Sequence, residues 1–354
     1  MDKIIIAIGN LNIGGGQSVV CKLAENINKN KHKVIVVCLG EKKNTSLEEK
    51  IESVAEVKYL NIKKGFSFYS FYVFDKAMRE ISPNVIHAHL GAVQFAAVWS
   101  ILHRKRIVIT AHTTPEKAFS RNTERVVRYG LKKHLVTLVA VSEDNWEKCI
   151  SYFNIDSSCC KFVNNGVDIH GKVERNRDYP FTFINVATQN ENKNQELLIN
   201  CFGDIVNCYP NSRLLLVGDG SEHDRLINHS EALGLNSKIV FVGEVSDPNP
   251  FYIQSDVYVQ SSHREAMPMS ILEALGYGLP VISTDVGGIK DVVKGNGLLV
   301  KDNDSVAFTS AMLSLLSMSE EAFDQLRLKS LEIVDNFSSG KMASEYEKIY
   351  ESLF

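Results

Sequence analysis

The sequence has 354 residues, of which 44% are hydrophobic and 23% are charged, a composition that excludes a disordered chain, a collagen-like fibre and a small disulfide scaffold. The length fits two domains of ordinary size. The net charge of −3 conceals an asymmetry, because residues 1–170 carry 24 Lys and Arg against 16 Asp and Glu, whereas residues 171–354 carry 15 against 26. This suggests that one half faces an anionic partner, the alternative being chance bias between two solvated surfaces.

The sequence carries no pattern typical of a membrane span or a secretion signal. Its longest strongly apolar stretch, residues 92–102, is shorter than the roughly 20 residues that a transmembrane helix needs. The apolar run at residues 4–8 is too short for a signal-peptide core and predicts a buried strand. The seven cysteines are scattered without a zinc-site spacing, so we expect free thiols and a cytoplasmic protein.

Short apolar runs alternate with amphipathic segments along residues 1–170. We expect strands at residues 3–8, 34–39, 85–88, 107–110 and 138–141, and helices at residues 19–30 and 68–81 among others. Runs that are apolar throughout are typical of strands covered on both faces. The alternation therefore predicts an α/β domain with a doubly wound parallel sheet.

Residues 167–179 interrupt this alternation, since they are polar and charged, and we interpret them as a linker. Beyond them we expect strands at residues 181–187, 213–217, 238–242, 257–259, 280–283 and 298–300, and helices at residues 194–206, 270–277 and 305–316. The sequence thus predicts two Rossmann-like domains, residues 1–170 and 178–337. An apolar stripe in the last segment predicts a helix over residues 338–354 that packs back on the first domain.

A glycine-rich turn, Gly14, Gly15 and Gly16, follows the first expected strand. Glycine lets the backbone approach a phosphate closely, and a following helix N-terminus offers unpaired N–H groups. The spacing departs from the dinucleotide-binding fingerprint, which disfavours an NAD-dependent oxidoreductase. We interpret the segment as a turn near a phosphate, the alternative being an ordinary connection between strand and helix.

Two glutamates, Glu265 and Glu273, flank Pro268, a residue that suits the start of a helix. The pattern places Glu265 in a loop and Glu273 about a turn and a half into that helix. Backbone amides just after Glu265 would point at an anion, and carboxylates accept hydrogen bonds from hydroxyls. The pattern favours a polyhydroxylated anionic ligand, although either glutamate alone is more often an exposed helix residue.

Six motifs together resemble those of the retaining glycosyltransferases of family four, whose α/β GT-B fold has two Rossmann-like domains facing a central cleft. They are Gly14-Gly15, Asn165-Gly166-Val167-Asp168, Val217-Gly218-Asp219-Gly220, Phe241-Val242-Gly243-Glu244-Val245, the stretch from Glu265 to Val281, and Asp285-Val286-Gly287-Gly288. The resemblance covers nearly the whole chain. It implies a metal-independent hexosyltransferase that moves a sugar with retention from a nucleotide diphosphate, expected to be UDP, to a hydroxyl of a glycan or lipid-linked acceptor in cell-surface glycan or capsule biosynthesis.

The resemblance also assigns roles to single residues. It implies that Glu273 binds the ribose, that Glu265 contacts the donor sugar, that Lys193 binds the diphosphate, and that His112 lies near the reacting sugar, unless this histidine is structural. The implied backbone contacts are Gly14, Gly15, Gly16, Ala266, Met267, Pro268 and Met269 with the diphosphate and sugar, and Gly243 and Val245 with the base. Thr188 stands where the family has a diphosphate-binding Arg. This departure motivates the alternative of a non-catalytic GT-B subunit that scaffolds a partner transferase.

We expect neither a metal nor an organic cofactor, and no nucleic-acid partner. Asp304, in an Asp-x-Asp string with Asp302, is better interpreted as the N-cap of the helix at residues 305–316. A basic stripe and an aromatic segment, residues 63–74, favour peripheral contact with an anionic membrane, the alternative being core aromatics and a solvated helix face. The stripe consists of Arg121, Arg125, Arg128, Lys132 and Lys133.

Overall fold

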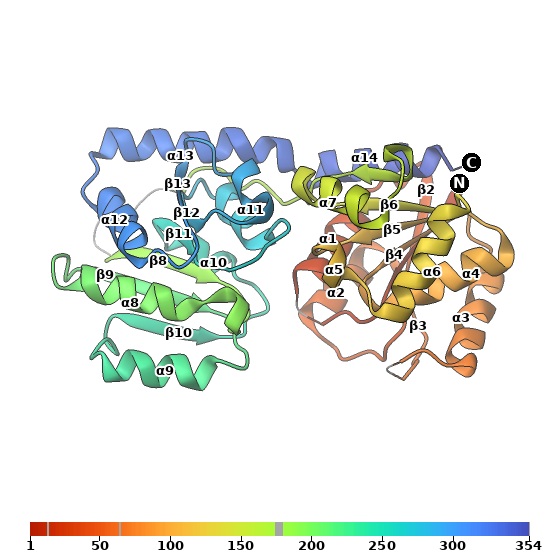
Figure 1. Ribbon diagram of the computed structural model, residues 1–354, viewed down its shortest axis with the longest axis horizontal. Helices are drawn as coiled ribbons and strands as arrows, with labels where there is room; N and C mark the ends of the chain where they lie inside the picture. Colours follow the sequence, from red (N-terminus) through yellow and green to blue (C-terminus); the bar gives the residue numbers. More distant parts are fainter. Residues whose placement is uncertain (13, 64, 174–179, 354) are drawn as a thin grey trace. The chain divides into compact units, whose positions relative to one another are not determined.

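The computed structural model describes residues 1–12, 14–63, 65–173 and 180–353 (Figure 1). They form two compact units, Met1–Gly166 with Ser339–Phe354, and Val167–Ser338. The second unit begins at Val167, because the Val167 N–H donates to the carbonyl of Phe337 at 2.9 Å. The expected linker at residues 167–179 is therefore part of this unit as far as residue 173, and its remainder lies outside the described residues.

The first unit is built on a seven-stranded parallel sheet. In spatial order the strands are β3 (Glu56–Tyr59), β2 (His32–Cys38), β1 (Asp2–Ile8), β4 (Val85–His89), β5 (Ile107–Ala111), β6 (Val136–Ala140) and β7 (Cys160–Phe162). The strand order reverses between β1 and β4, where Ile5 lies opposite Ile86. Ligands of doubly wound sheets bind beyond the carboxyl ends of the strands at such a reversal.

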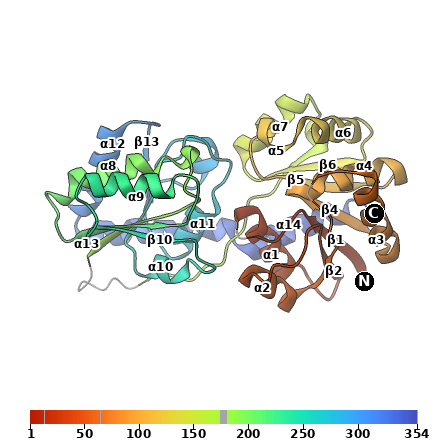
Figure 2. The same cartoon turned by 90° about the horizontal axis from the view of Figure 1, so that it is seen from below.

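Helices cover both faces of this sheet, which explains why residues 4–8 of β1 are all apolar and buried. Ile5 and Ala7 share one core with residues of α3 (Phe68–Ile81), α4 (Val93–His103), α6 (Arg121–Lys132) and α7 (Glu143–Phe153). α1 (Gly15–Asn26) packs against both α2 (Ser46–Val54) and α14 (Ser339–Glu351) (Figure 2). The remaining short helices of this unit are η1 (Leu90–Ala92), α5 (Pro115–Ala118) and η2 (Ser157–Cys159).

The second unit is also built on a parallel sheet, which here has six strands. Its strands are, in spatial order, β10 (Ile239–Gly243), β9 (Ser212–Val217), β8 (Phe181–Val186), β11 (Val257–Gln260), β12 (Val281–Thr284) and β13 (Gly297–Val300). Its helices are η3 (Glu191–Lys193), α8 (Gln195–Val206), α9 (His223–Ala232), α10 (Asn249–Ile253), α11 (Met269–Gly276), η4 (Gly287–Asp291), α12 (Ser305–Leu316), α13 (Glu320–Val334) and η5 (Asp335–Phe337). The order reverses between β8 and β11.

The expected α/β architecture is confirmed, and the bounds of one functionally relevant helix differ. α1 spans Gly15–Asn26 and not residues 19–30, so Gly15 and Gly16 lie inside its first turn. Among the described residues no helix combines the length and apolar character needed to cross a bilayer. All seven cysteines are free thiols.

Candidate active site

The loops that follow β8 and β11 meet at the strand-order reversal of the second unit. The two strands are neighbours, with Ile184 opposite Tyr258, although they are far apart in the sequence. The loop after β8 contains Thr188 and Lys193, and the loop after β11 leads through Glu265 into α11. This edge is where a doubly wound sheet places its ligand.

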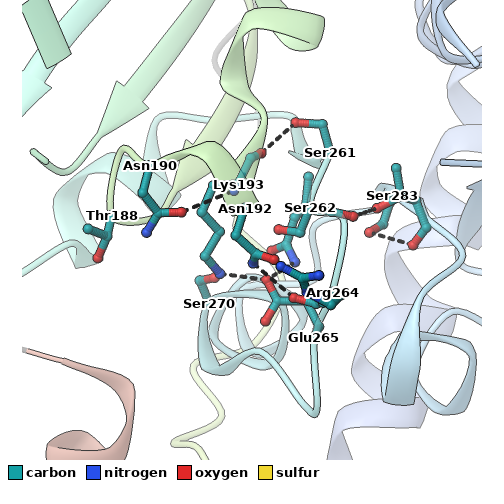
Figure 3. Close-up of polar contacts among 12 residues, drawn as sticks. Thr188, Asn190, Asn192, Lys193, Ser261, Ser262, Arg264, Glu265, Ser270 and Ser283 are labelled. Atoms are coloured by element: carbon teal, nitrogen blue, oxygen red, sulfur yellow. Dashed lines mark hydrogen bonds and ion pairs between the residues drawn. The ribbon is translucent and has the colours of Figure 1, made fainter. Parts of the chain in front are cut away.

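Lys193 and Glu265 form an ion pair at this edge of the sheet (Figure 3). The Lys193 Nζ donates to the Glu265 Oε1 at 2.5 Å, and the Gln260 Nε2 donates to the same oxygen at 3.1 Å. The two ionised side chains are only 19% and 12% exposed. Within the described parts of the chain the Glu265 Oε2 has no hydrogen-bond donor, so this oxygen is the one that can accept a ligand hydroxyl.

A buried tyrosine joins β11 to the helix that follows the glutamate loop. The Tyr258 hydroxyl lies 3.0 Å from the Gln260 Oε1 and 2.7 Å from the Ser270 Oγ. Burial raises the pKa of Tyr258, so its proton is retained at neutral pH. Through Gln260, this hydroxyl holds the Glu265 carboxylate relative to α11.

Glu273 is held on α11 by a second buried tyrosine. The Tyr252 hydroxyl, from α10, donates to the Glu273 Oε2 at 3.0 Å. The Tyr252 ring stacks on Tyr277, and the Tyr277 ring stacks on His170 with ring centroids 4.3 Å apart. Glu273 itself is half-buried, so its carboxylate is both oriented and reachable.

The N-terminus of α11 lies between the two glutamates. Ala266, Met267 and Met269 are each less than a tenth exposed, and Pro268 occupies the N-cap position. The first-turn N–H groups of a helix have no intrahelical acceptor and carry partial positive charge. This backbone can therefore receive an anion next to the Lys193–Glu265 pair.

Two glycine-containing loops hold this edge by direct backbone packing. A Cβ at Gly287 would overlap the carbonyl oxygen of Glu265, and the neighbouring Gly288 N–H donates to the Ala266 carbonyl at 2.9 Å. In the loop after β9, Cβ atoms at Gly218 and Gly220 would overlap the carbonyl oxygens of Ala187 and Gln189. These motifs thus support the site through their lack of side chains.

The remaining residues expected in the second unit lie at the same sheet edge. Gly243 has φ +80° and its carbonyl accepts from the Gly218 N–H at 2.8 Å, which places the loop containing half-buried Val245 beside the loop after β9. Thr188 is exposed directly beyond β8. Its carbonyl accepts from the Gln195 Nε2 at 3.3 Å.

In the first unit, the glycine turn lies beside the end of β4. A Cβ on Gly16 would come within 3.0 Å of the Leu90 Cδ1, and one on Gly9 within 3.0 Å of the Gly91 Cα. Gly14 is the N-cap of α1 and Gly15 is its first residue. This close packing places the N-terminus of α1 beside the strand-order reversal of the first sheet. The N-terminus of α1 is therefore a second position that suits an anion.

His112 follows β5 at the same edge of the first sheet. Its Nε2 lies 2.8 Å from the Nδ1 of His89, the last residue of β4. Burial lowers the pKa of His112 to about 4, so the imidazole is neutral at physiological pH. His89 was not predicted as a site residue, although His87 and His89 alternate at the end of an apolar run, which was a usable signal.

The acidic residues at the end of β13 have structural partners. The Asp304 carboxylate caps α12 by accepting from the Ala307 N–H at 2.9 Å, which confirms its expected role. Asp302 lies 2.9 Å from the His263 Nδ1. Within the described ranges, no three His, Cys, Asp or Glu side chains gather in a way that could hold a metal ion.

Two family models match successive parts of the sequence. The model for glycosyltransferase family 4 matches residues 13–170, and the model for glycosyl transferases group 1 matches residues 168–327. Together they span both structural units. The second match contains Lys193, Glu265 and Glu273, and the first contains the glycine turn and His112.

Known relatives and solved structures agree with these matches. An uncharacterized glycosyltransferase from Haemophilus influenzae is 25% identical over 99% of this chain and 100% of its own length. The Escherichia coli UDP-Gal:alpha-D-GlcNAc-diphosphoundecaprenol alpha-1,3-galactosyltransferase is 25% identical over 82% of this chain and 80% of that protein. Two other relatives are matched over 58% and 46% of their own lengths. Anabaena Alr3699/HepE in complex with UDP-glucose has the same fold, with a TM-score of 0.84, 18% identity and 99% coverage of both chains.

Proposed function

The chain belongs to the group 1 glycosyltransferases of family four and has their GT-B fold, and we propose that it transfers a hexose from a UDP-sugar to a hydroxyl acceptor with retention of configuration. The observation that carries the proposal is the arrangement in the second unit of Lys193, Glu265, Glu273 and the N-terminus of α11. One edge of one sheet thereby offers a cation, helix amides and two oriented carboxylates.

These groups suit the parts of a nucleotide sugar. The α11 amides and Lys193 would stabilise the diphosphate, whose charge grows as the glycosidic bond breaks. The Glu265 Oε2 would accept from a sugar hydroxyl, and Glu273 from the ribose hydroxyls. Val245 and Gly243 would lie beside the base. The binding of UDP-glucose by Alr3699/HepE supports UDP as the nucleotide.

Retention would proceed without a side-chain nucleophile. The Glu265 Oε1 is already bound by Lys193 and Gln260, and the Glu265 Oε2 would accept from a hydroxyl of the donor sugar, so this carboxylate would have a positioning role. The acceptor would attack from the face that the diphosphate leaves, and the departing phosphate oxygen would take the acceptor's proton. His112, as a neutral donor, would hydrogen-bond an oxygen of the donor substrate.

The acceptor is proposed to be lipid-linked, in the assembly of a cell-surface glycan. The E. coli relative named above acts on a diphosphoundecaprenol-linked sugar, which supports this class. The first unit also exposes suitable groups. On α3 and just before it, Phe66, Phe68, Tyr69 and Tyr72 are 39%, 95%, 76% and 61% exposed, whereas Phe74 is fully buried.

The basic stripe on α6 has fewer exposed members than the sequence indicates, because Arg128 does not belong to it. Arg128 turns toward the protein, where it binds Glu124 at 2.8 Å and the carbonyl of Tyr152 at 2.9 Å. Arg121, Arg125, Lys132 and Lys133 are exposed, and with the α3 aromatics they define the proposed contact with an anionic leaflet on the cytoplasmic side. Lys64, also part of the aromatic segment considered above, lies outside the described residues.

Purified protein and a panel of nucleotide sugars test the function. We expect thermal stabilisation by one UDP-sugar and its turnover in the presence of a glycan-lipid acceptor. Glu265→Gln should retain stabilisation by UDP and lose turnover, whereas Glu231→Gln, on the exposed side of α9, should behave as the wild type. Stabilisation without turnover in the wild type would instead support the non-catalytic scaffold that exposed Thr188 motivates.

Vesicle co-sedimentation tests the membrane contact separately. We expect binding to vesicles that contain phosphatidylglycerol and release by salt, because the attraction between exposed charges is screened beyond about 8–10 Å. Phe68→Ser with Tyr69→Ser should weaken binding without changing UDP affinity. Equal binding to neutral and anionic vesicles would contradict this part of the proposal.

A further inference from the structure

A chain of hydrogen bonds fixes the histidine that lies behind the His89–His112 pair. The His87 Nδ1 is 2.7 Å from the Tyr350 hydroxyl, and its Nε2 is 2.7 Å from the Thr110 Oγ1. The Thr110 Oγ1 is in turn 2.9 Å from the Tyr346 hydroxyl. Both tyrosines lie on α14, so the C-terminal helix holds the His87 ring in one orientation.

The His89 ring packs against this fixed ring at a tilt of 45° between the ring planes. The centroids of the His87 and His89 rings are 4.0 Å apart, and His89 has no exposed surface. Its Nδ1 faces the His112 Nε2 at 2.8 Å. Its Nε2 is buried and, among the residues that the structure describes, has no hydrogen-bond partner.

The number of protons on the pair follows from this burial. Burial lowers the pKa of His89 well below its ordinary value and that of His112 to about 4, so both rings are neutral near pH 7. A neutral imidazole carries one N–H and one acceptor nitrogen. A single hydrogen therefore lies between the His89 Nδ1 and the His112 Nε2.

The buried His89 Nε2, which has no partner among the described residues, indicates which ring donates this hydrogen. If His112 donated, the His89 hydrogen would lie on Nε2 and form a buried N–H without an acceptor, a rarer arrangement in proteins than an acceptor without a donor. If His89 donates, its Nε2 is only an unused acceptor. The second arrangement places the His112 hydrogen on Nδ1, a solvent-accessible atom that makes no hydrogen bond to any described residue.

We infer that His89 is a positioning residue, which donates from Nδ1 to the His112 Nε2 and so fixes His112 as the Nδ1–H tautomer. His112 then presents a neutral N–H to an oxygen of the ligand. The inference rests on the proposed function only for the identity of that ligand, an oxygen of the UDP-sugar. The tautomer itself depends on the protein alone.

Nitrogen-15 NMR of histidine-labelled full-length protein near neutral pH tests the tautomer. We expect the His112 Nδ1 to show the shift of a protonated nitrogen and the Nε2 that of an unprotonated one. His89→Asn keeps an amide N–H near the position of the His89 Nδ1 and should preserve this signature. His89→Leu removes the donor and should release His112 into a mixture of tautomers, whereas His134→Asn, at an exposed site in the same unit, should change nothing.

Kinetics with the productive UDP-sugar provide the second readout. His89→Leu should lower kcat about tenfold, less than the roughly 10²–10³-fold loss that follows removal of a transition-state hydrogen-bond donor, because His112 itself is still present. KM for the donor should change less than kcat. His89→Asn should recover most of kcat. An Nε2–H tautomer of His112 in the wild type, or an unchanged Nδ1–H signature in folded His89→Leu, would overturn the inference. Absence of transfer by the wild type would overturn the proposed function and leave the NMR result standing.

Discussion

Gly287 packs against Glu265 so closely that any side chain at position 287 would overlap the Glu265 carbonyl oxygen. Gly287 also has φ +58°, a conformation that costs other residues roughly 1–2 kcal/mol. The Gly-Gly motif after β12 is thus a backbone support for the carboxylate loop, although it is distant from that loop in the sequence.

Gly287→Ala should therefore displace the Glu265 loop and weaken UDP-sugar turnover by more than tenfold, within the range expected when catalytic groups are misplaced by about 1 Å. Gly295→Ala is the matched control, because Gly295 has φ +81° and nothing within 4 Å of an added Cβ. The control should lose stability to a similar strain and keep its turnover. Equal turnover in the two variants, measured at a temperature where both are folded, would show that the contact with Glu265 has no functional effect.

Glu273→Ala should weaken UDP binding by roughly 1–3 kcal/mol, the value of charge-assisted hydrogen bonds. Tyr252→Phe should weaken it less, because it keeps the Glu273 carboxylate and removes the hydroxyl that lies 3.0 Å from the Glu273 Oε2 and 3.2 Å from the Ser270 carbonyl oxygen. Titration calorimetry measures both, with Glu196→Ala on α8 as a control away from the carboxylates. Wild-type affinity in Glu273→Ala would refute the ribose-binding role.

Thr188→Arg should strengthen UDP binding by roughly 1–2 kcal/mol, since Thr188 is exposed beyond β8 and a guanidinium there would add a bidentate contact to the diphosphate. Thr188→Gln has a long side chain without charge and should have little effect. The same titration compares the two variants. A gain with Gln as large as that with Arg would argue against an electrostatic origin.

Turnover should survive chelation. The proposed diphosphate site contains Lys193 and the α11 N-terminus, and these groups can stabilise the leaving phosphate without an ion. Transfer is measured before and after EDTA, with manganese added back as the control. Loss with EDTA and recovery with manganese would contradict the prediction and would direct attention to Asp302, which has His263 as its partner.

Periodicity alone predicted most of this fold, and the missed strands have a common property. β3 and β7 are short edge strands with largely unburied side chains, so neither carries the continuous apolar run that marks the inner strands. In the site, the motifs indicated Glu265 and Lys193 separately. Their ion pair joins positions 72 residues apart and forms because β8 and β11 are paired in the sheet, which the sequence does not show. Tyr258 was indistinguishable from a core residue of its strand, because only the fold shows its hydroxyl facing Gln260.

The histidine cluster should make the protein less stable in mild acid. Burial lowers the pKa values of His87, His89 and His112 in the folded state, whereas in the unfolded chain they stay near 6.5. Below that value the unfolded state binds more protons, so stability is full above about pH 6.5 and falls as the pH decreases. For His112 the loss continues until about pH 4, where the folded state is protonated too.

Each such histidine contributes at most about 1.4 kcal/mol per pH unit to this loss. The melting temperature at about pH 5 should accordingly be lower than at about pH 7.5, and His112→Asn should reduce the difference because it removes one of the three groups. His134→Asn, which removes an exposed histidine, should leave the difference as in the wild type. If His112→Asn and the wild type lose the same stability between these two pH values, His112 is not held neutral by the fold. Its partly exposed ring would then be protonated in both states, and the neutral N–H proposed to meet the sugar donor would not exist at the lower pH.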